Sequence, residues 1–404
     1  MPSPELMLPV SRFSSLRSCA CGCIALGLSS SLAIDGLPID YTPIIDGHVD
    51  FSFCYADGEW EMGLVHEVGG DPNNPADGTP KSGELAPMIA RDQLFPSGSR
   101  ALRLTAPLWT FLGVNPATPY WYFPEGNWVG VYPGFNVCDI EDAVSYLEPD
   151  PRINTPGQWT TVTLRNVDYR GKQSSGGHFS LWTTDSFGQP TVWMSSATNG
   201  IDPSDKYYVL SGAHSHPNMG FSALGLYAVT FDLTFYEGPG KTNPNTSPVV
   251  AYYFAIGTFW QWIAEHFDPS FWFVNGTVGE NDDPDRDGIS NLVEYACDLD
   301  PTTPDNTPFS TPLGRGLPTI SSQSGGTSLL SRFPLRLTSE NPQLDVLVES
   351  SPSLSSTSWQ PSPGTTQKTP LRPGWETCSH SISIANPATQ FLRLRISLQT
   401  QIPY

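Results

Sequence analysis

The sequence predicts a mainly β protein: an antiparallel β-sandwich of jelly-roll or immunoglobulin-like type, a short helical calcium-loop segment, and a second, small β-sandwich domain. Three observations lead to this fold class. The 404 residues include 40 Pro and 36 Gly, and only 15% are charged, which is typical of strands joined by turns. Apolar and polar residues alternate with a period of two through much of the chain. Finally, the charge balance changes near residue 310, which indicates a separate C-terminal part.

The strand pattern is clearest at 226–235, where every second residue is apolar and the others are mostly polar. The same alternation runs through 49–55, and Asp57-Gly58 then predicts a hairpin turn with 60–66 as the returning strand. Further strands are expected at 159–167, 178–184, 191–194, 206–210 and 249–257. Residues 259–267 instead place apolar side chains at helical spacing, so a short helix follows the sandwich.

Four segments are expected along the chain. Residues 1–33 are a signal peptide and 34–257 the first β-sandwich, 258–309 hold the helix and a calcium-loop linker, and 310–404 contain a Pro/Ser-rich linker and the small β domain. Acidic residues far outnumber basic ones before residue 310, whereas basic residues are in slight excess beyond it. We therefore place the main boundary there.

The N-terminal residues have the organisation of a secretory signal. Arg12 and Arg17 precede an apolar stretch of small residues, and a small-x-small site ends at Ala33. We therefore expect export to the periplasm, the cell surface or the extracellular space. The mature chain would keep four cysteines, Cys54, Cys138, Cys297 and Cys378. Three disulfide pairings of these are possible, and the sequence leaves all of them open.

Charge and hydropathy exclude several classes of protein. The net charge of −20 leaves no basic surface for a phosphate backbone, so we expect no binding of nucleic acid. No run beyond the signal approaches the roughly 18 apolar residues that a membrane helix needs, so we expect no transmembrane span. The sequence contains no motif of zinc proteases, serine hydrolases, P-loop proteins or dinucleotide-binding enzymes, which predicts a protein that is not an enzyme.

Residues 283–294 have the oxygen spacing of a twelve-residue calcium loop. The expected Ca²⁺ ligands are Asp283, Asp285, Asp287, the backbone carbonyl of Ile289, Asn291 and Glu294. Gly288 stands at the sixth position, where the loop turns sharply. No regular helix precedes the loop, so we expect an ion that braces the structure, since millimolar extracellular calcium fills even a weak site.

This stretch resembles the thrombospondin type 3-like calcium repeat of secreted bacterial proteins, whose pattern D-x-D-x-D-G-x-x-N-x-x-E-Y ends here at Tyr295. The small β domain that follows is similar to the C-terminal parts of many large exported bacterial proteins. The resemblance implies a secreted protein with a structural calcium ion.

Histidines form a second candidate site. His214 and His216 are an H-x-H pair, whose imidazoles point to one face of an extended chain. His48 and Asp50 likewise share a face of the first strand, and His66 lies on the returning strand. Imidazole and carboxylate groups of this kind suit Zn²⁺ or Cu²⁺, although the spacing alone also fits ordinary hydrogen-bonded histidines.

Residues 44–240 resemble the choice-of-anchor M domain of bacterial surface-anchored proteins. The resemblance rests on the sequence G-H-V-D at 47–50 and on G-A-H-S-H at 212–216, which G-L-Y follows at 225–227. Members are exported and β-rich, and some are encoded beside metal-uptake transporters, which implies metal handling. The matching positions are His48, Asp50, His214 and His216, with His66 in the corresponding region. The chain departs from the family at 63–65, which hold no second histidine, and at 217–221, where an aromatic residue is expected earlier.

Together these features predict an exported, non-enzymatic binding or scaffold protein of the cell surface or the extracellular medium. Its expected partners are metal ions and an unidentified surface or extracellular molecule. Two alternatives stay open: a periplasmic or surface transition-metal carrier that serves metal uptake, and a secreted metal-dependent or carbohydrate-active hydrolase. The hydrolase would need three metal ligands, an open coordination position and a general base. By residue type, His48, His214 and His216 could serve as the ligands and Glu67 as the base.

Overall fold

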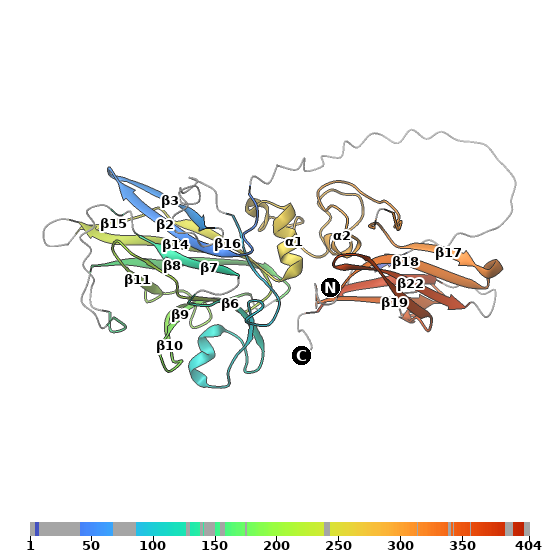
Figure 1. Cartoon of the computed structure of the whole chain (residues 1–404), viewed down its shortest axis with the longest axis horizontal. Coiled ribbons are helices and arrows are strands. Elements are labelled where there is room, and N and C mark those ends of the chain that lie inside the picture. Colours follow the sequence, from blue (N-terminus) through green and yellow to red (C-terminus); the bar gives the residue numbers. More distant parts are fainter. Residues whose placement is uncertain are drawn as a thin grey trace. The chain divides into compact units, whose positions relative to one another are not determined.

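The computed structural model describes residues 5–7, 41–67, 86–126, 130–137, 140, 150–153, 158–173, 176–237, 243–312, 314–337, 341, 343–355, 357–383 and 391–399. The chain forms two compact units, Ile39–Phe273 and Val274–Tyr404, the second including Met1–Pro38. Both consist mainly of antiparallel sheets with few helices, which confirms the predicted β class (Figure 1). Of the expected signal peptide, only β1 (Glu5–Met7) lies within the described residues.

The first unit contains three sheets, with strand orders β11-β8-β14-β16-β4, β10-β9-β13-β6-β5 and β12-β7-β2-β3. Their strands are β2 (Gly47–Ala56), β3 (Glu59–Glu67), β4 (Met88–Ala90), β5 (Arg100–Leu102), β6 (Pro119–Phe123), β7 (Val131–Asn136), β8 (Trp159–Gly171), β9 (Phe179–Thr184), β10 (Pro190–Ser195), β11 (Lys206–Leu210), β12 (His214–Ser215), β13 (Asn218–Phe221), β14 (Gly225–Glu237), β15 (Asn243–Thr246), which pairs with β14, and β16 (Val250–Ile256).

Strand β14 crosses the centre of this unit, between β8 and β16. The alternating apolar side chains that predicted it, among them Tyr227, Phe231 and Leu233, are fully buried in the main core. Its polar face is also covered: Asp232 is buried, and its carboxylate accepts a 2.7 Å hydrogen bond from Nε of Arg165 on β8. Strand β14 is therefore buried on both faces near its middle, more than the alternation alone indicates.

The predicted hairpin joins β2 to β3. Asp57 and Gly58 form the turn, with positive φ angles of 53° and 86°, as a two-residue type I′ connection requires. On its other edge β2 pairs in parallel with β7, which in turn pairs with β12. Residues near 50, 133 and 215 therefore lie side by side in one sheet.

Helical elements are few in the first unit. They are η1 (Pro107–Leu112), α1 (Thr258–His266) and η2 (Pro269–Phe271). Helix α1 buries Phe259, Trp262 and Ile263, the apolar stripe that predicted it. Residues 68–85 lie outside the described residues, and the segment that follows contains the short strand β4, which pairs in parallel with β16.

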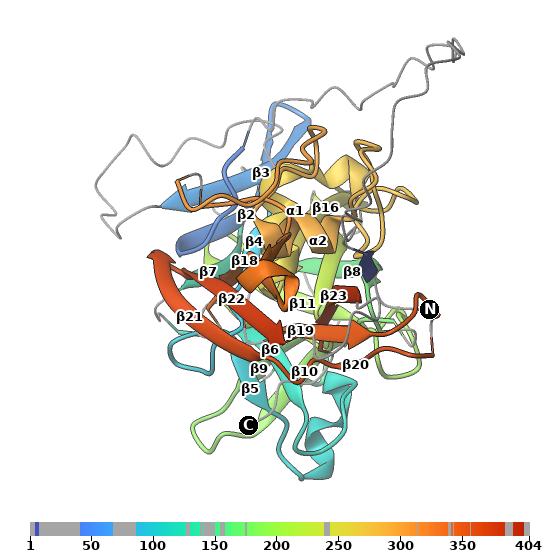
Figure 2. The ribbon, with the colours of Figure 1, turned by 90° about the vertical axis from the view of Figure 1, so that its right-hand side faces the viewer.

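Within the described residues, the second unit has two sheets, the α-helix α2 and the short 3-10 helix η3. The sheets run β1-β23-β19-β20 and β17-β18-β22-β21, the latter facing the viewer in Figure 2. The bounds are α2 (Asn291–Cys297), β17 (Thr319–Gln323), η3 (Ser324–Gly326), β18 (Ser328–Arg336), β19 (Leu344–Ser351), β20 (Gln360–Pro361), β21 (Thr365–Arg372), β22 (Trp375–Ser383) and β23 (Phe391–Leu398). Part of the stretch expected as a Pro/Ser-rich linker is thus strand β17.

Helix α2 is tied to the β domain by its Tyr295. The Tyr295 carbonyl accepts a 3.0 Å hydrogen bond from Nε of Arg336, whose guanidinium lies over the Tyr295 ring. The Tyr295 hydroxyl accepts a 2.7 Å bond from the amide of Asn341. The calcium-loop segment and the small β domain are therefore one packed unit.

Two further expectations concern disulfides and membrane helices. Within the described residues no disulfide joins Cys54, Cys297 or Cys378 to another of the three, so none of the three complete pairings forms. Cys138 lies outside those residues. Across the described chain, no helix has the length and hydropathy to cross a bilayer.

Candidate metal centres

Three histidines from two distant segments converge on the sheet β12-β7-β2-β3. His48 lies near the start of β2, His214 begins β12, and His216 directly follows β12. One ring nitrogen of each lies within 4.8 Å of the others. The Nε2 atoms of His48 and His216 are only 2.8 Å apart. The structure thus brings together three of the four histidines that the sequence pattern indicated.

Strand β7 creates this convergence, because it lies between β2 and β12. It pairs in parallel with β2, so Tyr132 lies opposite His48, and antiparallel with β12, which carries His214. The ring of His216 lies over β7 and stacks on Tyr132, with centroids 4.1 Å apart and an interplanar angle of 16°. Gly134 leaves the necessary space, since a Cβ atom there would lie 2.4 Å from Nδ1 of His216.

Asp50 adds a carboxylate to the cluster. It follows His48 by two residues on β2 and therefore projects from the same face. Its side chain is buried, and Oδ1 lies 3.6 Å from Nε2 of His48 and 3.4 Å from Nε2 of His216. The predicted pairing of His48 with Asp50 on one face is thus present.

The donor set and its spacing match a transition metal. Ligand bonds of about 2.0–2.1 Å in a tetrahedral site place neighbouring donor atoms about 3.3 Å apart. The Asp50 contacts of 3.4 and 3.6 Å have this spacing, and the 2.8 Å between His48 and His216 needs an opening of about half an ångström to reach it. Imidazole nitrogens with one carboxylate suit Zn²⁺ or Cu²⁺.

Electrostatics keep the buried imidazole in its metal-binding form. Burial, together with the neighbouring His48, lowers the pKa of His216 to about 4. His216 is therefore neutral at pH 7, and a lone pair is available for coordination. His214 is exposed, so the cluster is accessible from solvent on that side.

His66 lies apart from this cluster. It is on β3 opposite Val49, and cross-strand partners share a face, so it projects to the other side of the sheet from His48. Its Nε2 is 2.9 Å from the backbone carbonyl of Asp46, which accepts the hydrogen bond. A difference of one residue in register therefore separates His66 from the three converging histidines.

The calcium loop has the predicted convergent shape. Carboxylate oxygens of Asp283, Asp285 and Asp287 lie within 4.8 Å of one another. Gly288, with φ of 90°, turns the backbone, and its N–H donates a 3.0 Å hydrogen bond to Oδ2 of Asp283. The backbone N–H of Ile289 donates to Oδ1 of Asp287 at 2.8 Å, which fixes the middle of the loop.

The last two ligand positions are held by helix α2. Asn291 and Glu294 are fully buried. The Asn291 amide nitrogen donates to the carbonyls of Thr277 and Gly279 at 2.8 and 3.0 Å, which anchors the side chain. Among the described residues, Oδ1 of Asn291 and both carboxylate oxygens of Glu294 have no hydrogen-bond partner. Buried oxygens without partners are what a bound cation would satisfy.

The raised pKa values of the buried loop acids also indicate that a cation would stabilise this loop. Burial, together with the neighbouring carboxylates of Asp285, Asp287 and Asp283, raises the pKa of Glu294 to about 9. Burial also raises the pKa of Asp285 to about 6. At neutral pH the buried Glu294 therefore favours its protonated form, which a cation beside it would replace.

Sequence reasoning missed the framework of both sites. No expectation covered β7, because Pro133 and Gly134 interrupt its pattern, yet β7 aligns the histidines. The carbonyls of Thr277 and Gly279, which orient Asn291, carry no side-chain signal at all. Both depend on contacts between segments that are separate in sequence.

Comparisons with known proteins add no family. No family description matches the chain. No curated protein sequence matches it either. Among solved structures, the secreted serine protease VesC from Vibrio cholerae is similar over 60% of this chain and 45% of its own, at 11% identity and a TM-score of 0.12. The chain thus spans less than half of that protease, and a likeness of this size carries no argument.

Proposed function

We propose that this chain is an exported, non-enzymatic metal-binding protein of the cell surface or the extracellular medium. His48, His214 and His216, with Asp50 beside them, would bind a divalent transition metal such as Zn²⁺ or Cu²⁺. The observation that carries the proposal is the convergence of three imidazoles from segments more than 160 residues apart within 4.8 Å. The resemblance of residues 44–240 to the choice-of-anchor M domain agrees with this role and with export.

The position of Asp50 favours binding over catalysis. A hydrolytic zinc site keeps one coordination position open for water. Here Oδ1 of Asp50 lies beside Nε2 of both His48 and His216, where a fourth ligand would close the site. The exposed His214 leaves a route for the ion to exchange with solvent. A site whose four ligand positions are filled by the protein, but which solvent can reach, suits reversible metal binding at a surface.

The proposal includes a structural calcium ion at Asp283, Asp285, Asp287, the Ile289 carbonyl, Asn291 and Glu294. Its support is the set of buried loop oxygens for which the described residues offer no hydrogen-bond partner. The loop continues into α2, whose Tyr295 is held by Arg336 of the β domain. Calcium would therefore stabilise the second unit as a whole.

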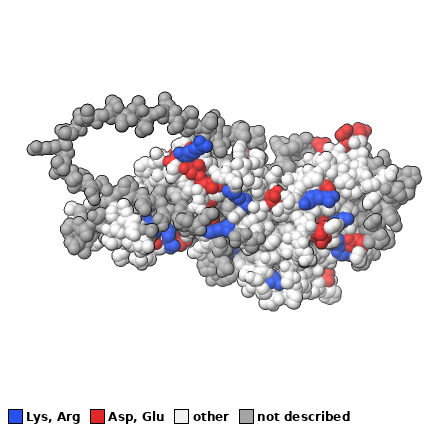
Figure 3. All heavy atoms as spheres, turned by 180° about the vertical axis from the view of Figure 1, so that it is seen from behind, with Lys and Arg blue, Asp and Glu red and all other residues white. Residues whose placement is uncertain are grey.

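The face drawn in Figure 3 offers few basic side chains to which a polyanion could bind. On the face drawn in Figure 3, the described Lys and Arg side chains are scattered and stand near Asp and Glu. Together with the net charge of −20, this agrees with metal ions, and not nucleic acids, as ligands.

The transition-metal proposal is tested by titrating the purified mature protein with Zn²⁺ and with Cu²⁺ against a competing chelator, in excess Ca²⁺. We expect His214→Ala, which removes an exposed ligand, to weaken binding by about 100-fold or more. His66→Ala is the matched control, because His66 lies on the β2–β3 hairpin that carries His48 but faces away from the cluster. Equal affinity in the wild type and His214→Ala would refute the site.

A further inference from the structure

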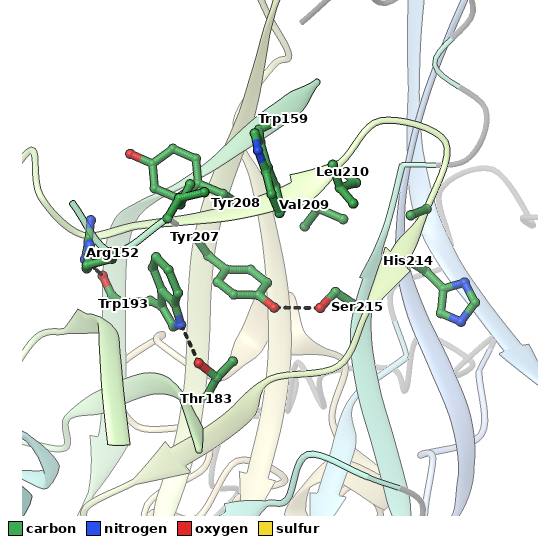
Figure 4. Close-up of a pocket in the computed structure, with 12 residues that line it drawn as sticks. Arg152, Trp159, Thr183, Trp193, Tyr207, Tyr208, Val209, Leu210, His214 and Ser215 are labelled. Atoms are coloured by element: carbon green, nitrogen blue, oxygen red, sulfur yellow. Dashed lines mark hydrogen bonds between the residues drawn. The ribbon is translucent and has the colours of Figure 1, made fainter. Parts of the chain in front are cut away.

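A cavity of about 460 Å³ lies in the first unit, beside β8, β10, β11 and β12. Figure 4 shows aromatic side chains around much of its wall, from Trp159, Trp193, Tyr207 and Tyr208. Its size falls in the range of roughly 300–1,000 Å³ that is typical of small-molecule sites. Trp159 and Tyr208 are only half-buried, so they retain ring surface for a ligand.

Among the described residues that line the cavity, the one cationic side chain is neutralised by a carboxylate. Arg152 is its cationic side chain, and Asp150 neutralises it through two hydrogen bonds, from Nη2 at 2.7 Å and from Nε at 3.0 Å. The Tyr208 hydroxyl also donates to Asp150, at 2.8 Å. The guanidinium lies over the Trp193 ring, 5.0 Å from its centroid, and Nη1 donates to the Trp193 carbonyl. A charged ligand would therefore find no opposite charge to pair with.

Hydroxyl groups, in contrast, are abundant. The Tyr207 hydroxyl and Oγ of Ser215 share one hydrogen bond of 2.6 Å, and Oγ1 of Thr183 accepts from Nε1 of Trp193 at 3.0 Å. Each hydroxyl can make more than one hydrogen bond, so these groups and that of Tyr208 keep capacity for a ligand. The cavity thus combines aromatic walls with neutral hydroxyl donors and acceptors.

We propose that this cavity binds a neutral saccharide of one or two rings. The apolar C–H face of a pyranose suits the rings of Trp159 and Tyr208, and its hydroxyls suit Ser215, Tyr207 and Thr183. The cavity adjoins the metal cluster, because His214 is also one of its lining residues. Ser215 projects toward Tyr207, whereas the neighbouring imidazole of His214 points away from the aromatic wall (Figure 4). Adjacent residues of β12 thereby serve opposite faces of one strand.

The test is a fluorescence and calorimetric titration of the mature full chain with methyl glycosides of glucose, galactose, mannose and N-acetylglucosamine. Glucuronic acid serves as a charged comparison and benzyl alcohol as an apolar one. We expect saturable binding of at least one neutral glycoside and a loss of about tenfold in affinity for Trp159→Ala. Trp109→Ala is the matched control, because Trp109 is also half-buried in this unit but packs against Trp182 and Phe111.

Three outcomes would overturn the proposal. The first is no binding of any neutral glycoside at millimolar concentration. The second is binding of only glucuronic acid or only benzyl alcohol, which would indicate an anion site or an apolar pocket. The third is equal affinity in Trp159→Ala and Trp109→Ala. A variant of the metal cluster, His48→Ala, should bind the glycoside like the wild type, so this result is independent of the metal proposal.

Discussion

Gly134 is the residue that most directly permits the histidine cluster. It lies on β7, and the ring of His216 occupies the space where a side chain would begin. Glycine in a strand interior commonly marks such a close approach, here by an imidazole and not by a backbone. The identity of one residue without a side chain thus decides whether two histidines 168 positions apart can meet.

Gly134→Ala tests this dependence. The new Cβ would lie 2.4 Å from Nδ1 of His216, so the ring must leave the position that places its Nε2 2.8 Å from Nε2 of His48. We expect at least a tenfold loss of Zn²⁺ affinity and a loss of about 1–3 kcal/mol in the free energy of unfolding, typical of overpacking. Chelator competition and thermal melting measure the two quantities. Unchanged affinity would mean that the His216 ring is not a ligand.

Asp50→Asn separates a ligand from a structural carboxylate. The amide has the same shape as the buried carboxylate but carries no charge beside His48 and His216. We expect metal affinity to fall by about 10–100-fold while the apo protein keeps its melting temperature. If affinity is unchanged, Asp50 takes no part in the site.

At the scale of elements, the calcium loop and α2 place buried carboxylic acids together where a cation would bind. The loop supplies three aspartates, and the first turn of α2 supplies Glu294, which is completely buried. Without an ion, the folded state favours the protonated form of Glu294, because burial raises its pKa to about 9 from an ordinary value near 4.5. The stability of the apo unit must then depend on pH.

We predict that in chelator the second unit loses stability as pH rises from about 5 to about 9. In this window the folded state binds one more proton than the unfolded chain, so the slope is negative, approaching about 1.4 kcal/mol per pH unit. Calcium should abolish the slope, because it replaces the proton. Chemical denaturation at several pH values, with calcium and with chelator, measures this effect.

Glu294→Gln should remove both the slope and calcium binding, while Glu265→Gln, at an exposed position of α1, should change neither. The Glu294→Gln variant should also be more stable than the apo wild type at pH 8, because its folding requires no uptake of a proton by a buried carboxylate. A pH-independent stability of the wild type in chelator would contradict the assignment.

At the scale of the whole molecule, the two ions are assigned to different units. The histidine cluster lies within Ile39–Phe273, and the calcium loop lies within the unit that contains Val274–Tyr404. Each unit has its own sheets, so each ion has a separate folded structure to stabilise.

We predict that amide exchange of the full chain will resolve the two effects. Zn²⁺ should slow exchange within 41–273 only, and Ca²⁺ should slow it within 274–399 only, because an ion protects the structure that its binding stabilises. His214→Ala should remove the first protection and Glu294→Gln the second. Protection of both units by either ion would show that the two sites are coupled.

The sequence by itself determined features that are local in the chain. The hairpin at Asp57-Gly58 follows from turn chemistry, β14 from its period of two, and the convergence of Asp283, Asp285 and Asp287 from their alternate spacing. In each case the interacting groups are within a few residues of one another, so spacing fixes their geometry.

Only the tertiary structure decided which histidines meet. His48 and His216 come together because β7 pairs in parallel with β2, and such a pairing leaves no mark in the sequence of either strand. His66 is excluded from the cluster because it pairs with Val49 and projects from the same face of the sheet as Val49, opposite to the face of His48. The sugar-sized cavity likewise depends on how five consecutive strands, β8 to β12, are placed in three different sheets. Spacing predicts where side chains point within one strand, but the pairing of strands decides what they face.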